Sequence, residues 1–442
     1  MGQGGGQRAG GPKGAGGRGA PAEDAEAAEG AEEGPSKLVA LDPGAMLDQP
    51  PVVVRLRPGA DRRVAGGHCW VFSNELSTPV ASLPLGGAVD VLDARGRFLG
   101  RGTANPHSLI AVRILSRDPQ DDVDSVAFYE RRLRAAAAMR ARLLPGRRSL
   151  RMVSSEGDGL PGLIVDQFED VIAVQLGTLG MELRRERLEA ALRSALGVRG
   201  AVLRNESPSR SLEGLPRGSE RWFGEVPERV MLEEGGVRLF ADVLGGQKTG
   251  FFFDQAENRA FARPRVAGER VLDVYANTGA WGLGALLHGA SRCDFIEINA
   301  ATAALILDNA ALNGVADRAN SIAGDARVVM EGLLAQNQRY GAVFLDPPAF
   351  AKTRAKAPVA LRAYANINAL AMRLVAPGGL LFSSSCSYHV QEDRFLEAVM
   401  AGARMSGRRL RVVRRGEQAP DHPVDPAVPE TRYLKHLVLH LE

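Results

Sequence analysis

Five stretches decide the fold: VLDVYANTGAWG (271–282), FIEIN (295–299), GDAR (324–327), FLDPPAF (344–350) and LLFSSSCSY (380–388). In each, an apolar run of strand length ends in a turn that contains Gly, Pro or polar residues. Segments of helix length separate the runs, which is typical of a parallel α/β sheet. Ligands of such sheets bind at the carboxyl ends of the strands, so we expect the functional residues in these turns.

The turn after the first strand indicates a nucleoside site. Asn277-Thr278-Gly279 leads into a helix expected to run to about His288. Glycine lets the backbone approach a ligand closely, and the helix start offers free amide donors. Asn277 stands where the first Gly of a dinucleotide fingerprint would be, which argues against NAD and favours the looser nucleoside turn of a methyltransferase. We assign Tyr275, Asn277, Thr278 and Gly279 to cofactor binding.

Acidic residues end three successive strands: Asp273, Glu297 and Asp325. Glu297 lies where a ribose-binding carboxylate is expected, and it can accept hydrogen bonds from both ribose hydroxyls. The alternative is that Glu297 only begins the helix expected near Ala300. Three acids suit an adenosine with a charged amino-acid tail better than a phosphate-bearing nucleotide, which would require Lys or backbone amides. We assign all three to the cofactor.

Asp346-Pro347-Pro348 leaves the fourth strand along a rigid path, because each Pro locks its own φ and restrains the residue before it. This stiffness suits a loop that holds a flat ring against a cofactor. A simple loop with two prolines is the alternative. The motif resembles that of S-adenosylmethionine-dependent methyltransferases that act on nucleobases or on amide nitrogens. The resemblance implies a cofactor and catalytic role for Asp346, and substrate contacts for Pro347 and Pro348.

Cys386 follows the last strand into the same opening, within Ser385-Cys386-Ser387. Most lone cysteines are small buried hydrophobes, which is our interpretation of Cys69 and Cys293. Carbon 5 of cytosine is a poor nucleophile, and a thiolate that adds to carbon 6 enables it to attack a methyl group. Ser-Cys-Ser beside Asp-Pro-Pro resembles the nucleophile motif of RNA 5-methylcytosine methyltransferases.

Length and composition point to a cytoplasmic protein of more than one domain. The chain has 442 residues, 45% of them hydrophobic, without a run of membrane-spanning length or an apolar N-terminal signal. Three cysteines suit a reducing compartment, and no Cys/His spacing indicates a zinc site, so we expect no metal. Residues 49–442 carry 51 Lys and Arg against 44 Asp and Glu, a net of +7, which is compatible with RNA binding.

The N-terminal part reads as a tail followed by a small barrel. Residues 1–48 are rich in Gly, Ala and Glu, and we expect disorder; Met46 leaves open whether this extension is genuine or a misassigned start. Short β runs separated by Gly and Pro turns predict a β barrel over 49–120 that resembles the RNA-binding PUA domain. Trp70 and Phe72 are candidates for stacking on bases, with core packing as the alternative.

The middle of the chain predicts a helix over 121–150 and an α+β domain of order β-β-α-β-β over 151–244, with a loop at 206–230. The catalytic domain is then expected over 245–442. In the joint between the two domains, Gln255 is a candidate for the methionine end of the cofactor and Lys248 for RNA phosphate. Further candidates for substrate contact are Arg204, Lys352 and Trp70.

From about residue 52 to its end, the chain resembles the 23S ribosomal RNA large-subunit methyltransferase I family, which makes 5-methylcytosine. Besides the motifs above, the likeness includes EGDGLPG (156–162), KTG (248–250), DHP (421–423) and YLK (433–435). It implies a class I, Rossmann-like methyltransferase domain preceded by a PUA-like barrel and an α+β domain. It also implies S-adenosylmethionine as cofactor and large-subunit ribosomal RNA as partner, and the choice between monomer and homodimer stays open.

The family implies Cys386 as the nucleophile and Asp346 as the group that orients the cytosine ring and protonates or hydrogen-bonds it. The chain departs from larger two-cysteine RNA enzymes, because Ala349 stands where their second Cys follows Pro-Pro. Elimination therefore requires another base, and the candidates are Lys352, His389, His422 and water.

Three other functions remain open from the sequence. A guanine-modifying RNA methyltransferase of the same fold would use Asp-Pro-Pro without a thiol. A non-catalytic RNA-binding factor for ribosome assembly would use the barrel alone and would lack affinity for S-adenosylmethionine. A protein methyltransferase typically has Asn in place of Asp346 and no PUA-like domain.

Overall fold

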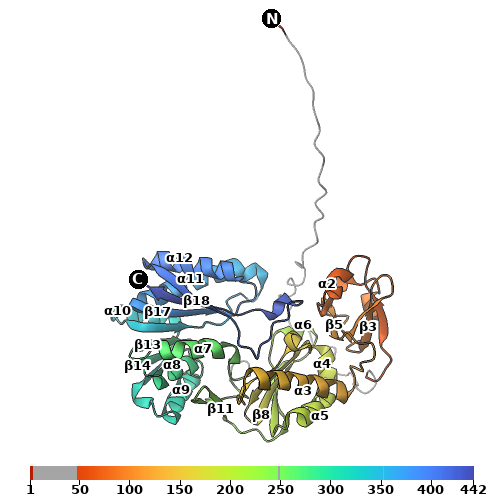
Figure 1. The fold of residues 1–442 in the computed structure, drawn as a ribbon, viewed down its shortest axis with the longest axis horizontal. Helices are drawn as coiled ribbons and strands as arrows, with labels where there is room; N and C mark the ends of the chain where they lie inside the picture. Colours follow the sequence, from red (N-terminus) through yellow and green to blue (C-terminus); the bar gives the residue numbers. More distant parts are fainter. Residues whose placement is uncertain (3–46, 247–248, 352) are drawn as a thin grey trace. The chain divides into compact units, whose positions relative to one another are not determined.

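The computed structural model describes residues 1–2, 47–246, 249–351 and 353–442 (Figure 1). The disorder expected for the N-terminal tail falls almost entirely on residues 3–46, which lie outside these ranges. All the elements described below belong to one compact unit that includes residues 47–442. None of the helices in the described ranges combines the length and the apolar character that a bilayer crossing requires.

The first domain is a five-stranded sheet around an apolar core that includes Val54, Val71, Val89 and Val112. Its strands are β1 (Val52–Arg55), β2 (Trp70–Phe72), β3 (Ala88–Leu92), β4 (Phe98–Ala104) and β5 (Ile110–Ser116), in the order β1-β3-β4-β5-β2, with helix α2 (Asp61–Ala65) between β1 and β2. The β runs expected from the sequence in this region are confirmed as strands. Leu56 and Leu76 also form an isolated antiparallel β-bridge outside these strands.

Helix α3 (Val126–Leu143) follows, and it is shorter than the expected helix. Ser125 caps its N-terminus by accepting a 3.2 Å hydrogen bond from the backbone N–H of Phe128. Phe128 and Leu133 on its apolar face are buried in the core of the next domain. The middle of the helix is therefore packed in the core of the central domain.

The central domain contains a second five-stranded sheet. Its strands are β6 (Leu150–Ser154), β7 (Leu163–Phe168), β8 (Val171–Leu176), β9 (Gly200–Asn205) and β10 (Gly218–Gly224), in the order β10-β9-β8-β7-β6, and its helices are α4 (Leu179–Leu183), α5 (Arg185–Leu196) and α6 (Ser209–Leu212). The loop expected at 206–230 is wrong, because α6 and β10 lie within it. Edge strand β10 buries only Phe223, so its sequence lacks the apolar alternation of a strand.

The expected β-β-α-β-β order also needs correction. Strand β12 (Val237–Ala241) pairs with β11 (Val230–Glu234) as a separate hairpin and not with the central sheet. Leu232 and Leu239 of this hairpin share one apolar core with Phe168 of the central sheet and Leu283 of the C-terminal domain. The hairpin thus packs against both the central domain and the C-terminal domain.

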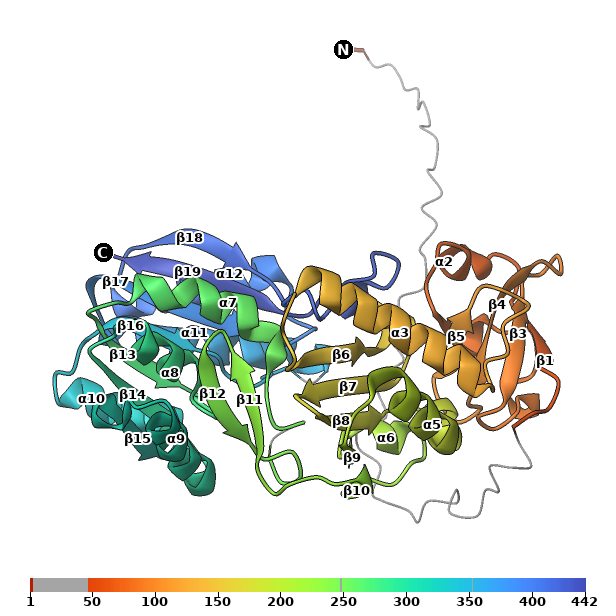
Figure 2. The ribbon, with the colours of Figure 1, turned by 60° about the horizontal axis from the view of Figure 1, so that its bottom comes forward.

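The C-terminal domain, which the sequence predicts to be the catalytic one, is built on a seven-stranded sheet (Figure 2). Its strands are β13 (Arg270–Val274), β14 (Arg292–Glu297), β15 (Ala319–Ala323), β16 (Tyr340–Leu345), β17 (Val375–Ser385), β18 (Leu410–Gly416) and β19 (Lys435–Leu441), in the order β15-β14-β13-β16-β17-β19-β18. The first five in this order are parallel, and the pairs β17–β19 and β18–β19 are antiparallel. The parallel α/β sheet expected from the sequence is confirmed.

Helices cover both faces of this sheet (Figure 1). They are α7 (Ala256–Ala262), α8 (Ala280–Leu287) and α9 (Ala300–Leu312) on one face, and α10 (Ala326–Ala335), α11 (Ala357–Leu374) and α12 (Glu392–Ser406) on the other. Successive side chains of a strand point to opposite faces, so Phe344 packs under the first group while Val343 and Leu345 pack under the second. The continuous apolar runs of the sequence arise because both faces are buried.

Candidate active site

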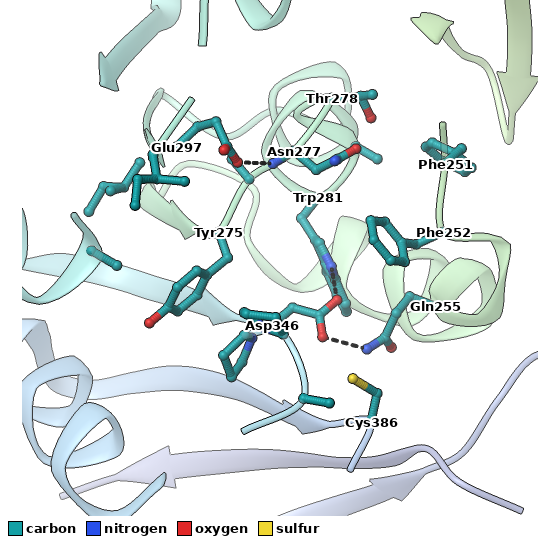
Figure 3. Close-up of a pocket in the computed structure, with 18 of the residues that line it drawn as sticks. Phe251, Phe252, Gln255, Tyr275, Asn277, Thr278, Trp281, Glu297, Asp346 and Cys386 are labelled. Carbon is teal, nitrogen blue, oxygen red and sulfur yellow. Dashed lines mark hydrogen bonds between the residues drawn. The ribbon is translucent and has the colours of Figure 1, made fainter. Parts of the chain in front are cut away.

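A pocket of about 390 Å³ lies at the carboxyl ends of the parallel strands, where the strand order reverses at β13. Cavities that bind small ligands typically measure about 300–1,000 Å³. The turns after β13 to β17 form its wall together with the segments before α7 and β19 (Figure 3). Ten of the residues assigned from the sequence line it: Gln255, Tyr275, Asn277, Thr278, Glu297, Asp325, Asp346, Pro347, Pro348 and Cys386.

The turn after β13 follows an uncommon backbone path. Tyr275, Asn277 and Gly279 have φ values of 65°, 49° and 85°, in the region that favours glycine. The backbone N–H of Asn277 donates a 3.0 Å hydrogen bond to Glu297, which helps to hold this conformation. Gly279 is not part of the pocket wall but is the N-cap of α8. Strained turns of this kind cluster at ligand sites.

Glu297 is 6% exposed at the end of β14. One carboxylate oxygen accepts the N–H of Asn277 and the other accepts the N–H of Asn299, at 3.0 and 3.1 Å. Each oxygen can accept a second hydrogen bond, so two acceptor positions remain for the hydroxyls of a ribose. The side chain of Asn299, not that of Glu297, caps helix α9 by accepting from the N–H of Thr302.

The other two strand-end acids have different positions. Asp325 lines the pocket and also caps α10, because its side chain accepts a 3.1 Å hydrogen bond from the N–H of Val328. Asp273 is fully buried behind the wall and accepts from the N–H of Gly282 at 2.9 Å. Burial raises the pKa of Asp273 to about 8. Asp273 is therefore not part of the pocket wall, and it supports the start of helix α8 behind the pocket.

Arg259 of α7 lines the pocket and was not identified from the sequence. Its guanidinium makes two hydrogen bonds to Glu234 of β11, at 2.7 and 2.5 Å, and a third to the carbonyl of Phe252. Both charged groups are buried, and such a paired arrangement fixes the guanidinium rigidly. The only signal in the sequence was a lone Arg in a helix, which is usually solvated.

Asp346 lies between two N–H donors (Figure 3). Gln255 Nε2 donates to Oδ1 at 2.9 Å, and Trp281 Nε1 approaches Oδ2 at 3.4 Å. Burial and the negative charge of Asp254 together raise the pKa of Asp346 to about 6. This carboxyl group therefore changes its protonation near neutral pH, as groups with acid–base roles do.

From the sequence, Gln255 is expected to contact the methionine end of the cofactor, but its polar atoms form hydrogen bonds with other side chains. Its Nε2 donates to Asp346 and also to Ser384 Oγ at 3.0 Å, while its Oε1 accepts from Asn258 Nδ2 at 2.8 Å. Both N–H groups of the amide are already used. Gln255 lines the pocket, but its polar atoms face Asp346.

Cys386 reaches the pocket because the two serines beside it point the other way. Ser385 Oγ and Ser387 Oγ each lie 2.9 Å from the hydroxyl of Tyr364, a buried residue of α11. In an extended segment, successive side chains alternate between the two sides, which turns Cys386 toward the opening. Figure 3 shows its sulfur pointing toward Asp346 and Gln255. The Ser-Cys-Ser spacing thus has a direct structural reason.

Lys435 is a second residue that the sequence did not identify as functional. It pairs with Ser385 in the β17–β19 ladder, and its Nζ donates to the carbonyls of Ser387 and Tyr433 at 2.6 and 2.7 Å. Burial lowers its pKa to about 8, and the negative charge of Cys386 opposes this change. A positive charge is therefore held beside the turn that carries the thiol.

The residues expected to contact RNA have mixed positions. Arg204, a candidate for substrate contact, is 1% exposed, and its guanidinium donates to the carbonyls of Val243 and Gly246 inside the protein. Trp70 is half-buried in the first domain, and its Nε1 donates to Glu156 at 3.1 Å. Lys248 and Lys352 lie outside the described residues.

Two candidate bases are away from the pocket. His422 is buried against Asp421, with Nδ1 2.9 Å from Oδ1, and neither His422 nor His389 is part of the pocket wall. Across the residues that the structure describes, no three His, Cys, Asp or Glu side chains gather in a way that could hold a metal ion.

Two protein-family models match the chain. A PUA-like domain matches residues 54–117, and an S-adenosylmethionine-dependent methyltransferase matches residues 160–438. The ribosomal RNA large subunit methyltransferase I of Shewanella denitrificans is 36% identical over 392 residues, which cover 87% of this chain and 98% of that protein. The protein of the same name from Pseudoalteromonas atlantica is 34% identical over 388 residues, with the same shares covered.

Solved structures share the fold. SMU.776, described as a methyltransferase and crystallised with SAH, has a TM-score of 0.75 and 18% identity, and the match covers 89% of this chain and all of that one. A protein from Streptococcus mutans, described as SAM-dependent, has a TM-score of 0.74 and 17% identity over 88% of this chain and all of its own. At these identities the likeness concerns the fold alone.

Proposed function

The chain belongs to the ribosomal RNA large subunit methyltransferase I family, a family of S-adenosylmethionine-dependent enzymes, and we propose that it methylates carbon 5 of a cytosine in large-subunit ribosomal RNA. One observation carries the cytosine assignment. Asp346 and Cys386 line the same pocket as the residues suited to hold the cofactor. A thiol in this position has a chemical use in pyrimidine methylation that it lacks in guanine methylation.

The residues of the pocket suit S-adenosylmethionine. Glu297 has two acceptor positions for the ribose, and Asn277 Oδ1 is a buried polar atom without a hydrogen-bond partner among the described residues. Ile296, Ile298 and Tyr275 provide apolar surface for an adenine, and the fixed guanidinium of Arg259 suits the carboxylate of the methionine part. When bound, the cofactor supplies an electrophilic methyl group.

Cys386 and Asp346 then divide the chemistry of the base. The Cys386 thiolate forms a bond to carbon 6 of the cytosine, and the electron pair of the carbon 5–carbon 6 double bond becomes available at carbon 5 for the methyl group. Asp346 hydrogen-bonds or protonates the ring as negative charge develops on it. Its pKa of about 6 allows it to do either near neutral pH. The positive charge of Lys435, which interacts with Cys386, stabilises the thiolate before attack and again when it leaves.

The last step removes the proton from carbon 5 and breaks the carbon–sulfur bond, which restores the thiolate. His389 and His422 are not part of the pocket wall, and Lys352 lies outside the described residues. Of the candidates from the sequence, water and Lys352 therefore remain as proton acceptors for this step. Ala349 lines the pocket at the position of the second cysteine of larger enzymes, so this chain has no thiol there to assist the release.

The test is methylation of ribosomal RNA that lacks the modification, followed by mass spectrometry of the nucleosides. We expect 5-methylcytidine at one site, and bisulfite mapping locates it. Formation of a methylguanosine instead would support the guanine-modifying alternative. Binding of RNA without affinity for S-adenosylmethionine would support the assembly factor.

A further inference from the structure

A buried chain of hydrogen bonds extends behind Asp346 and begins at a backbone carbonyl. Asn258 Nδ2 donates to the carbonyl of Glu417 at 3.1 Å and to Gln255 Oε1 at 2.8 Å. Gln255 Nε2 donates to Asp346 Oδ1 at 2.9 Å and to Ser384 Oγ at 3.0 Å. Asn258, Gln255 and Ser384 are each at most 2% exposed. These side chains come from α7, from the segment before it, and from β17.

The direction of each bond in this chain is determined. A backbone carbonyl can only accept, so the amide of Asn258 must turn its Nδ2 toward Glu417 and therefore also toward Gln255. Gln255 must then present Oε1 to Asn258 and Nε2 to Asp346. The reverse orientation of either amide would place two acceptors against each other in a buried site, which is costly.

The hydrogen bonds around Ser384 are consistent with this orientation of the Gln255 amide. Ser384 Oγ accepts from Gln255 and lies 2.9 Å from Nδ1 of His436, so its own hydrogen is available for that nitrogen. Burial lowers the pKa of His436 to about 3, so the ring is neutral and can accept. His436 also stacks on Trp281, with ring centroids 5.6 Å apart, and Trp281 faces the second oxygen of Asp346.

We propose that Gln255 is a positioning residue for Asp346, and that Asn258, Ser384 and His436 lock its amide with the N–H side toward the carboxylate. The consequence for catalysis rests on the proposed function, in which Asp346 contacts the cytosine. Each oxygen of Asp346 accepts one hydrogen bond from the protein, so the plane of the carboxyl group is fixed. One acceptor position on each oxygen remains for the edge of the base. The donors also favour the ionised carboxylate and so set the pH at which it takes up a proton.

The proposal is tested with Gln255→Glu and Gln255→Met. Glu keeps the size of the side chain, can still accept from Asn258 and can accept from Ser384, but it places a second carboxylate against Asp346. Met keeps the length and removes the donors. The matched control for the added charge is Gln336→Glu, because Gln336 is exposed at the end of α10 and is not part of the pocket wall.

The first readout is the carbon-13 NMR titration of the Asp346 carboxyl in protein without RNA, with the signal assigned by its loss in Asp346→Asn. We expect the midpoint to rise by about one pH unit or more in Gln255→Glu, and by less in Gln255→Met. The control should titrate like the native protein. Equal midpoints in all four proteins would overturn the proposal, whatever base the enzyme methylates.

The second readout separates positioning from cofactor binding. We expect kcat to fall by roughly 10²-fold in Gln255→Glu while the Kd for S-adenosylmethionine stays within about twofold. A loss of cofactor affinity as large as the loss of kcat would make Gln255 a cofactor ligand and overturn the proposal. Ser384→Ala is a milder variant that removes only one contact of the amide, and we expect a smaller midpoint shift in the same direction.

Discussion

Asp346 and Cys386 enter one pocket because the strands before them are neighbours: Leu345 of β16 pairs with Ser383 of β17 in a parallel ladder. Both residues follow the carboxyl ends of these strands. The ladder therefore fixes the carboxyl group and the thiol on the same side of the sheet. The proposed chemistry of the cytosine ring depends on this register.

Removal of the thiol should abolish methylation without affecting the cofactor. We expect Cys386→Ala to lower kcat by about 10³-fold or more, as loss of a nucleophile does in other enzymes. Its Kd for S-adenosylmethionine, measured by calorimetry, should stay within about twofold. The control is Cys69→Ala in the first domain, which should keep full activity. Full activity of Cys386→Ala would favour the guanine-modifying alternative.

Loss of the Lys435 charge should make the Cys386 thiol harder to ionise. In a Cys69→Ala background, with Cys293 fully buried, alkylation by iodoacetamide reports on Cys386. We expect Lys435→Met to move the midpoint of the alkylation rate about one unit toward higher pH, because a nearby cation favours the thiolate. The matched control is Lys356→Met on the exposed start of α11. An unchanged profile in Lys435→Met would remove Lys435 from the mechanism.

Weaker cofactor binding is expected when Glu297 loses its charge. Glu297→Gln keeps the shape of the side chain but leaves only one oxygen as an acceptor. A hydrogen bond to a charged group contributes about 1.5–3 kcal/mol, so the Kd for S-adenosylmethionine should rise roughly 10- to 100-fold. Asp308→Asn, which alters an exposed ion pair with Arg229, is the control. An unchanged Kd would show that the ribose lies elsewhere.

His436 should reduce the stability of the protein in acid. The unfolded state takes up a proton near pH 6.5, whereas burial lowers the pKa of His436 in the folded state to about 3. The free energy of unfolding therefore decreases as the pH falls below about 6.5, and the part of this decrease due to His436 reaches about 2 kcal/mol at pH 5. Asp273 and Asp346 have raised pKa values, so their contribution has the opposite sign.

The comparison of native protein with His436→Phe isolates this effect, because the two carboxyl groups remain in both. Urea unfolding at pH 7 and pH 5 should show a larger decrease in stability for the native protein than for the variant. Equal decreases would mean that His436 takes up a proton in the folded state.

Much of the catalytic domain could be predicted from the sequence, because parallel strands buried on both faces produce continuous apolar runs that end in recognisable turns. Glu297, Asp346 and Cys386 follow such runs directly. Edge strand β10 has no comparable signal, since only Phe223 is buried in it. Its pairing with β9 is a tertiary contact that no local pattern records.

The missed site residues share one property: their roles depend on segments distant in the chain. Lys435 lies beside the turn of Cys386 because β19 is antiparallel to β17, and Arg259 is held by Glu234 of a separate hairpin. Arg204 shows the opposite error. Arg204 was a candidate for substrate contact, but β9 is an inner strand of its sheet and the Arg204 guanidinium donates to backbone carbonyls.

The central claim is that the Cys386 sulfur bonds to the pyrimidine during methylation. RNA that contains 5-fluorocytidine tests it directly, because fluorine at carbon 5 cannot leave as a proton and the carbon–sulfur bond persists. With S-adenosylmethionine present, we expect a covalent protein–RNA adduct that resists denaturation, that maps to Cys386 by mass spectrometry and that is absent in Cys386→Ala. Methylation of normal RNA by an enzyme that forms no such adduct would contradict the account.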